Sequence, residues 1–181
     1  MTATIYSDLT GQFPVQSYEG MCYIFVVYYY KLYTIMLRPM KNREDASMIT
    51  AFKSVYAQLE GAGHKPRLHI LDNECSRAVQ NFLTTQGTTR QNVEAHNHRA
   101  NAAEPAVKTA KYHLISHLAT LDPNCPIQLW SQMLPQIEDT LNMLRTSRRD
   151  NKITAYEELH GLFDWNKTPL RPSFEIGRAS F

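Results

Sequence analysis

The segment that most constrains the fold of this chain is its most apolar run, MCYIFVVYYYKLYTIML, at residues 21–37. The run is too short to span a bilayer comfortably, and Lys31 interrupts it. It is rich in aromatic and β-branched residues, which favour strands. We therefore predict two β-strands joined by a short turn around Lys31, rather than a membrane-spanning helix, and expect no membrane partner.

The rest of the chain continues as short apolar runs and amphipathic segments, which predict an alternation of strands and helices. The expected strands cover residues 5–9, 23–29, 34–37, 66–72 and 91–95, and the expected helices cover 42–63, 74–87, 102–121, 126–145 and 154–161. In the helix at 126–145 we expect Trp130, Ile137, Leu141 and Leu144 to face inward. This order predicts an α/β domain with a five-stranded mixed sheet flanked by helices and a C-terminal helical extension, which is the order of the ribonuclease H-like fold.

The length of 181 residues is that of one medium domain, which can bury a core without disulfides. We assign residues 1–125 to the core, 126–165 to a helical part of the same domain and 166–181 to an irregular tail. The net charge of +2 permits nucleic acid binding without demanding it. Three widely spaced cysteines (Cys22, Cys75 and Cys125) predict neither a disulfide framework nor a zinc ribbon, and a reducing intracellular setting fits them.

Three carboxylates stand out because of where they fall in the predicted order. Asp8 and Asp72 each end a predicted strand, although aspartate is a poor strand residue. In the predicted fold these two strands would be neighbours. Glu104 would lie in the first turn of the helix at 102–121, with thirty-one residues between it and Asp72. Carboxylates that converge from separate elements repel one another, so such a cluster favours binding of a divalent cation.

This constellation suits phosphoryl transfer to or from nucleic acid. Two Mg²⁺ or Mn²⁺ ions ~3.5–4 Å apart would activate an attacking oxygen and stabilise a leaving one, without a general-base side chain. Lys108 and Lys111 follow Glu104 at i+4 and i+7, on one stripe of the helix, where they would bind phosphates. Arg99 and His98, in the loop HNHRAN just upstream, are candidate phosphate or base contacts.

Each of these residues also has an ordinary explanation. Asp8 could open a turn by accepting a hydrogen bond from a nearby backbone N–H, and Asp72 or Asn73 could cap the next helix. Glu104 could complement the helix dipole, and the two lysines could be ordinary solvated side chains. Glu74 is a rival carboxylate near Asp72, which we interpret as a solvated residue at a helix start. We favour the metal site because fold order, spacing and the lysine stripe agree.

Four motifs together, YSDLTGQFP, LDNECS, HNHRANAAE followed by VKTAKYHLI, and TAYEELHGLFDWNKTPLRP, resemble the integrase catalytic core of copia-like long-terminal-repeat retrotransposons. The resemblance covers about residues 5–172. It implies a catalytic and metal-binding triad of Asp8, Asp72 and Glu104 with Mg²⁺ or Mn²⁺. It also implies that Lys108 and Lys111 contact the DNA end of the element. The interval before Glu104 is thirty-one residues rather than the family's usual thirty-five, and Pro105 follows the glutamate where the family usually has a basic or polar residue.

The function implied by this resemblance is DNA integration, in which the element's 3′ ends are processed and then transferred to target DNA. The partners would be element and target DNA and further copies of the chain, with no small-molecule substrate. The expected location is nuclear during action on host DNA and a cytoplasmic particle before that, not secreted. Two alternatives stay open: an inactive nucleic-acid-binding or interaction domain from a decayed retroelement, and a ribonuclease H-type or transposase nuclease.

Overall fold

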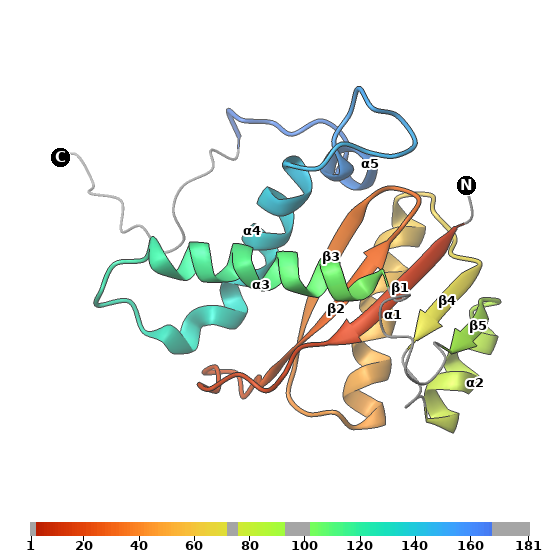
Figure 1. Cartoon of the computed structure of the whole chain (residues 1–181), viewed down its shortest axis with the longest axis horizontal. Coiled ribbons are helices and arrows are strands. Elements are labelled where there is room, and N and C mark those ends of the chain that lie inside the picture. Colours follow the sequence, from red (N-terminus) through yellow and green to blue (C-terminus); the bar gives the residue numbers. More distant parts are fainter. Residues whose placement is uncertain (1–2, 72–75, 93–101, 168–181) are drawn as a thin grey trace.

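A mixed five-stranded sheet forms the centre of the computed structural model, which describes residues 3–71, 76–92 and 102–167. The strands are β1 (Thr4–Leu9), β2 (Tyr23–Tyr29), β3 (Thr34–Met40), β4 (Leu68–Leu71) and β5 (Thr89–Asn92), in the spatial order β3-β2-β1-β4-β5 (Figure 1). Short connections make β1, β2 and β3 an antiparallel meander, whereas β4 and β5 run parallel to β1 after helical crossovers.

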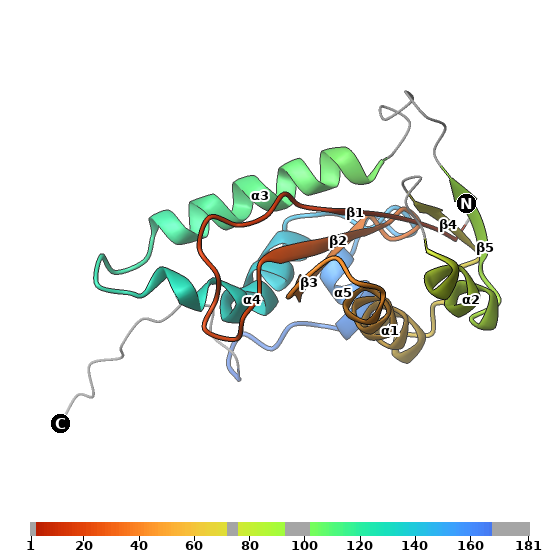
Figure 2. The same cartoon turned by 90° about the horizontal axis from the view of Figure 1, so that it is seen from below.

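Helices cover both faces of this sheet, as Figure 2 shows for α3 on one side and α1 on the other. The helices are α1 (Asp45–Gly61), α2 (Arg77–Thr85), α3 (Ala103–Ala119), the short 3₁₀ helix η2 (Ile127–Leu129), α4 (Trp130–Met143) and α5 (Ala155–His160). The predicted class, a ribonuclease H-like α/β fold with a five-stranded mixed sheet, flanking helices and further helices at its C-terminal end, is therefore confirmed.

The strand β2, which lies between β3 and β1, is buried on both faces, and this explains the apolar run that contains it. Phe25, Val27 and Tyr29 belong to the core beneath α1 and α2, and the alternate residues belong to the core beneath α3 and α4. Both predicted strands of the run form, with Lys31 in the turn between them. Within the described ranges, no helix has the length and apolar character needed to cross a membrane.

The structure corrects several predicted boundaries. β3 continues to Met40 rather than ending at residue 37, and it accommodates Pro39 because β3 is an edge strand. The helix expected at 126–145 begins as η2 and ends at Met143. Leu144 was expected to face inward but is 77% exposed, because the helical periodicity stops one residue before it. β5 covers Thr89–Asn92, and residues 93–95 of the expected strand lie outside the described residues.

Candidate active site

The pairing of β1 with β4 brings the two predicted aspartate-bearing strand ends to one edge of the sheet. The two strands run parallel, with Thr4 opposite Leu68 and Tyr6 opposite Ile70. Their carboxyl ends therefore meet at the same edge, where ligands commonly bind in α/β proteins. The predicted adjacency of the strands is confirmed. β4 ends at Leu71, and Asp72, the next residue, lies outside the described residues.

Asp8 lies near the carboxyl end of β1, opposite Val26 of β2. Because Val26 belongs to the core beneath α3 and α4, the alternation of the sheet places Asp8 on the face that α3 covers. The side chain is half-buried, and its Oδ1 accepts a hydrogen bond from the backbone N–H of Leu9 over 2.7 Å. Asp8 therefore accepts the backbone hydrogen bond that an ordinary turn residue would accept. It also lies at the strand end where we expect a metal ligand.

Glu104 occupies the first turn of α3, as predicted. The helix packs on β1 and β2 through an apolar face that includes Ala106, Ala110 and Leu114, which leaves Glu104 exposed. Pro105 also falls in the first turn, where its missing N–H would have no acceptor within the helix. Pro105 is therefore compatible with the helix, and Glu104 stays within it.

The lysine stripe also forms as predicted. Lys108 and Lys111 are exposed one and two turns after Glu104, and the Lys108 ammonium lies 5.8 Å from the centre of the Tyr112 ring. The other two predicted DNA contacts, His98 and Arg99, lie outside the described residues, as does Glu74. Of the predicted site, the structure thus places Asp8, Glu104, Lys108 and Lys111.

A cavity of about 330 Å³ opens at the strand end that carries Asp8, between the strand ends and the starts of α1 and α2, on the opposite side of the sheet from α3. Its polar lining includes Ser7, Asp8 and Ser76. Ser76 is the N-cap of α2, and its Oγ accepts a hydrogen bond from the N–H of Val79 over 3.3 Å. The capping role suggested for Asp72 or Asn73 is therefore wrong, since Ser76 already fills it.

The residue types predicted for the site fit a hard divalent cation, because Asp8 and Glu104 carry carboxylate oxygens, the donors that Mg²⁺ prefers. Across residues 3–71, 76–92 and 102–167, no three His, Cys, Asp or Glu side chains gather closely enough to hold a metal ion. The third expected ligand, Asp72, falls in one of the gaps between these ranges.

One residue that supports this site was missed by the sequence reasoning. His69 of β4 is completely buried, its Nε2 lies 2.8 Å from Ser7 Oγ, and its Nδ1 lies 3.3 Å from Tyr56 Oη. Burial lowers the pKa of His69 to about 3, so the ring is neutral. This network ties β4 to β1 next to Asp8 and to α1. A lone histidine in a strand gives no sequence signal for such partners.

The order and direction of the strands, with helices on both faces, define a ribonuclease H-like fold. No protein-family model matches the chain, and no curated protein matches it. Solved structures do. The simian T-cell lymphotropic virus intasome, in complex with PP2A regulatory subunit B56 gamma, matches with a TM-score of 0.68 and 18% identity over 88% of this chain. This chain spans only 54% of the viral one.

Isolated catalytic cores match over nearly their whole length. The HTLV-2 integrase catalytic core domain in complex with magnesium, in its trimeric form, gives a TM-score of 0.65 at 18% identity, with 88% of this chain and 97% of that one covered. The BIV integrase catalytic core domain gives 0.63 at 13% identity, with 88% and 94% covered. The chain therefore has the fold of retroviral integrase catalytic cores.

Proposed function

We propose that this chain is the catalytic core of an integrase, of the copia-like retrotransposon type, that processes DNA 3′ ends and joins them to target DNA. One observation carries the proposal. The parallel pairing of β1 with β4 brings the end of β1, which carries Asp8, beside the end of β4, after which Asp72 follows in the sequence. The Asp8 side chain lies on the sheet face that α3 covers. Glu104 lies in the first turn of that helix.

The proposed metal ligands are Asp8, Asp72 and Glu104. Tyr6 lies opposite Ile70, and in the sequence Asp8 and Asp72 each follow these partners by two residues. We infer that the three carboxylates hold two Mg²⁺ or Mn²⁺ ions, and the HTLV-2 core with magnesium supports this choice of metal. Such ions, when bound, supply activation of the attacking oxygen and charge stabilisation at the leaving one.

The surrounding residues then bind and orient DNA. Lys108 and Lys111, exposed on α3 after Glu104, hold phosphates of the element's DNA end. His98 and Arg99, which precede this helix in the sequence, are proposed to add further contacts. The first reaction frees a 3′ hydroxyl, and the second lets that hydroxyl attack a phosphodiester of the target. In this proposal residues 1–125 and 126–165 act as one core, followed by the tail at 166–181.

The chain would work as a homo-oligomer on element and target DNA. The matching HTLV-2 structures are described as dimeric and trimeric forms, and the simian virus match is an intasome, which supports this expectation. The proposed location is the nucleus during action on host DNA and a cytoplasmic particle before that.

A strand-transfer assay tests the proposal. A labelled duplex carrying the terminal repeat of the locus that encodes the chain is incubated with the protein in Mg²⁺ or Mn²⁺. We expect joined products from the wild type, and a loss of about 100-fold or more in Asp8→Asn and Glu104→Gln, because each variant removes a ligand charge. Asp122→Asn, a matched change at an exposed loop carboxylate, should keep full activity.

Two results would count against the proposal. Wild-type protein that binds the duplex but yields no product in either ion would favour the inactive nucleic-acid-binding domain instead. Products formed equally well by the wild type, Asp8→Asn and Glu104→Gln would show that the chemistry occurs elsewhere in the protein.

A further inference from the structure

A second hollow, of about 230 Å³, lies beside the first turns of α3 and the C-terminal end of β2, where Tyr28 follows Val26 by two residues on the same face of the sheet. We call it the tyrosine–arginine pocket, and its aromatic and basic lining consists of Tyr28, Tyr30, Tyr33, Arg145 and Arg148. Pro105 and Thr109 of α3 line it as well, together with Ala102 and Ala106. Pro105 precedes Lys108 by three residues, so the pocket lies along the side of α3 next to the lysine stripe.

Both guanidinium groups of the pocket are held in place by tyrosines. The Arg145 guanidinium lies 3.7 Å from the centre of the Tyr33 ring, and its Nε donates to the Tyr33 carbonyl over 2.7 Å. The Arg148 guanidinium lies 4.0 Å from the Tyr30 ring centre, and its Nη2 donates to Tyr28 Oη over 3.0 Å. Stacked, hydrogen-bonded guanidiniums lose little freedom when they bind a ligand.

The pocket carries positive charge that no carboxylate described here neutralises. In the described part of the chain, Arg38 and Arg149 form ion pairs with Glu138 and Glu158, but neither pocket arginine has an acidic group within 4.0 Å. Burial lowers the pKa of Arg145, and the neighbouring charge of Arg148 acts in the same direction. A bound anion would relieve both effects.

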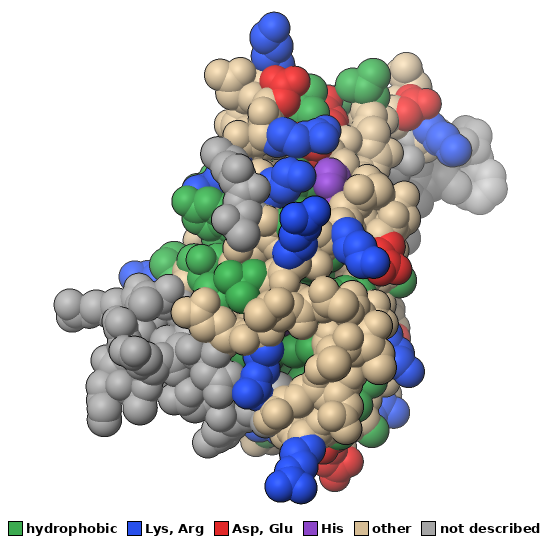
Figure 3. Space-filling model, turned by 90° about the vertical axis from the view of Figure 1, so that its right-hand side faces the viewer, with side chains coloured by type: hydrophobic (Ala, Val, Ile, Leu, Met, Phe, Trp, Pro, Cys, Tyr) green, Lys and Arg blue, Asp and Glu red, His purple; other side chains and the backbone are tan. Residues whose placement is uncertain are grey.

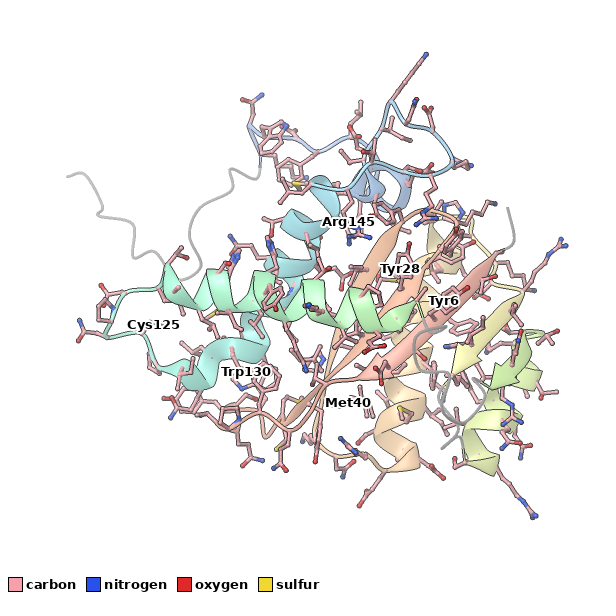
Figure 4. All side chains as sticks on the ribbon, in the orientation of Figure 1. Tyr6, Tyr28, Met40, Cys125, Trp130 and Arg145 are labelled. Carbon is pink, nitrogen blue, oxygen red and sulfur yellow. The ribbon has the colours of Figure 1, made fainter. Side chains whose placement is uncertain are left out.

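The two pocket arginines lie next to a cluster of tyrosine rings. In Figure 4, Arg145, Tyr28 and Tyr6 follow one another from the end of α4 across β2 and β1. The Tyr6 ring centre lies 6.2 Å from that of Tyr28 and 6.3 Å from that of Tyr30. Figure 3 shows Lys and Arg side chains gathering toward the end of the molecule that carries the loop between α4 and α5.

We propose that the tyrosine–arginine pocket binds a backbone phosphate of DNA, separately from the lysine stripe on α3. Guanidinium groups match the geometry of phosphate oxygens and bind them bidentately. The hollow is smaller than the usual 300–1,000 Å³ of small-molecule sites, which suits a single phosphate better than a whole nucleotide ligand. This inference rests on the proposed function, since it takes DNA as the ligand of the core.

The test measures binding of a fluorescent DNA duplex by anisotropy, in EDTA so that no reaction occurs, at salt concentrations from 50 to 200 mM. The variant is Arg148→Gln, which removes one exposed charge, and Arg148→Lys restores the charge without the planar group. Lys53→Gln is the matched control, because Lys53 is exposed on α1, on the other side of the sheet. Thermal unfolding of each variant reports on folding.

We expect Arg148→Gln to bind more weakly at low salt. Its affinity for the duplex should depend less steeply on salt. The ratio of wild-type to variant affinity should therefore fall by about 3.5-fold between 50 and 200 mM salt, which is the change expected for the loss of one phosphate contact. Arg148→Lys should recover most of the salt dependence, and Lys53→Gln should match the wild type.

Other results would overturn the inference. Equal affinity and salt dependence of Arg148→Gln and wild type would remove the pocket from DNA binding and leave the proposed function standing. Failure of Arg148→Lys to recover the salt dependence would show that the arginine only holds the loop against the tyrosines. Wild-type protein that binds no duplex at any salt concentration would remove both the pocket and the proposed function.

Discussion

His69 joins the strand of Asp8 to the strand that leads to Asp72. Its ring is completely buried, with one nitrogen hydrogen-bonded to Ser7 of β1 and the other to Tyr56 of α1. A neutral imidazole can make both hydrogen bonds, because one of its nitrogens donates and the other accepts. Burial is the cause of its lowered pKa, because a charged ring would lose its contact with water there. Between about pH 3 and pH 6.5, His69 is therefore neutral in the folded state but largely protonated in the unfolded state.

The stability of the protein should consequently fall in mild acid. Unfolded His69 gains a proton below pH 6.5, whereas folded His69 stays neutral down to about pH 3, so the unfolded state is favoured progressively between these values. Urea unfolding from pH 7 to pH 4.5 measures this dependence. His69→Gln, which cannot titrate, should show a shallower decline than the wild type. Parallel declines in the two proteins would contradict a buried neutral ring.

Single residues differ in how far the sequence reveals their roles. Asp8 and Glu104 could be selected because a carboxylate at a strand end or helix start is visible in the local pattern. The partners of His69 and Arg148 could not, because Ser7 is 62 residues from His69 and Tyr28 is 120 residues from Arg148. Such contacts depend on the packing of whole elements, which no short motif encodes.

Among the elements, α4 protects the outer edge of β3. Asn142 accepts a hydrogen bond from the Ile35 N–H over 2.9 Å and donates to the Ile35 carbonyl over 2.8 Å. One turn earlier, Glu138 accepts from the Leu37 N–H and from Arg38, each over 2.7 Å. The helix thus satisfies backbone groups that an edge strand would leave open to pairing with another chain.

Asn142→Ala should destabilise the fold by about 2–4 kcal/mol, because it leaves a buried N–H and a buried carbonyl of β3 without partners. Denaturant unfolding of the variant measures the change in the free energy of unfolding. Asn151→Ala, at an exposed loop position, should change it by less than about 0.5 kcal/mol. A similarly small effect in Asn142→Ala would show that α4 does not protect this edge.

The elements themselves were largely predictable, because strand alternation and helical spacing are local properties. One error arose at a helix end, where Leu144 was expected to be buried but is exposed. Another arose at Pro39, which β3 includes because it is an edge strand, a position that the sequence does not reveal. The polar residues Glu138 and Asn142 on the inner face of α4 were not predicted. Their role depends on the edge of β3 lying alongside, about 100 residues away in the chain.

For the whole molecule, the strand order decides what the candidate site can be. β1 and β4 are neighbours only because the chain crosses over through α1 and returns parallel to β1. That topology brings the end of β1, which carries Asp8, beside the end of β4, after which Asp72 follows in the sequence. The sequence indicated this arrangement through the order of its elements. At 13–18% sequence identity, the similarity of this chain to retroviral integrase cores is a similarity of fold.

The central claim, that Asp8, Asp72 and Glu104 form one metal site, is tested most directly by Mn²⁺ titration followed by electron paramagnetic resonance. Asp72→Asn should bind Mn²⁺ about tenfold or more weakly than the wild type, because ligand charge sets the affinity of a carboxylate site. Asp122→Asn should bind like the wild type. Equal Mn²⁺ affinity in the wild type and Asp72→Asn would contradict the three-carboxylate site.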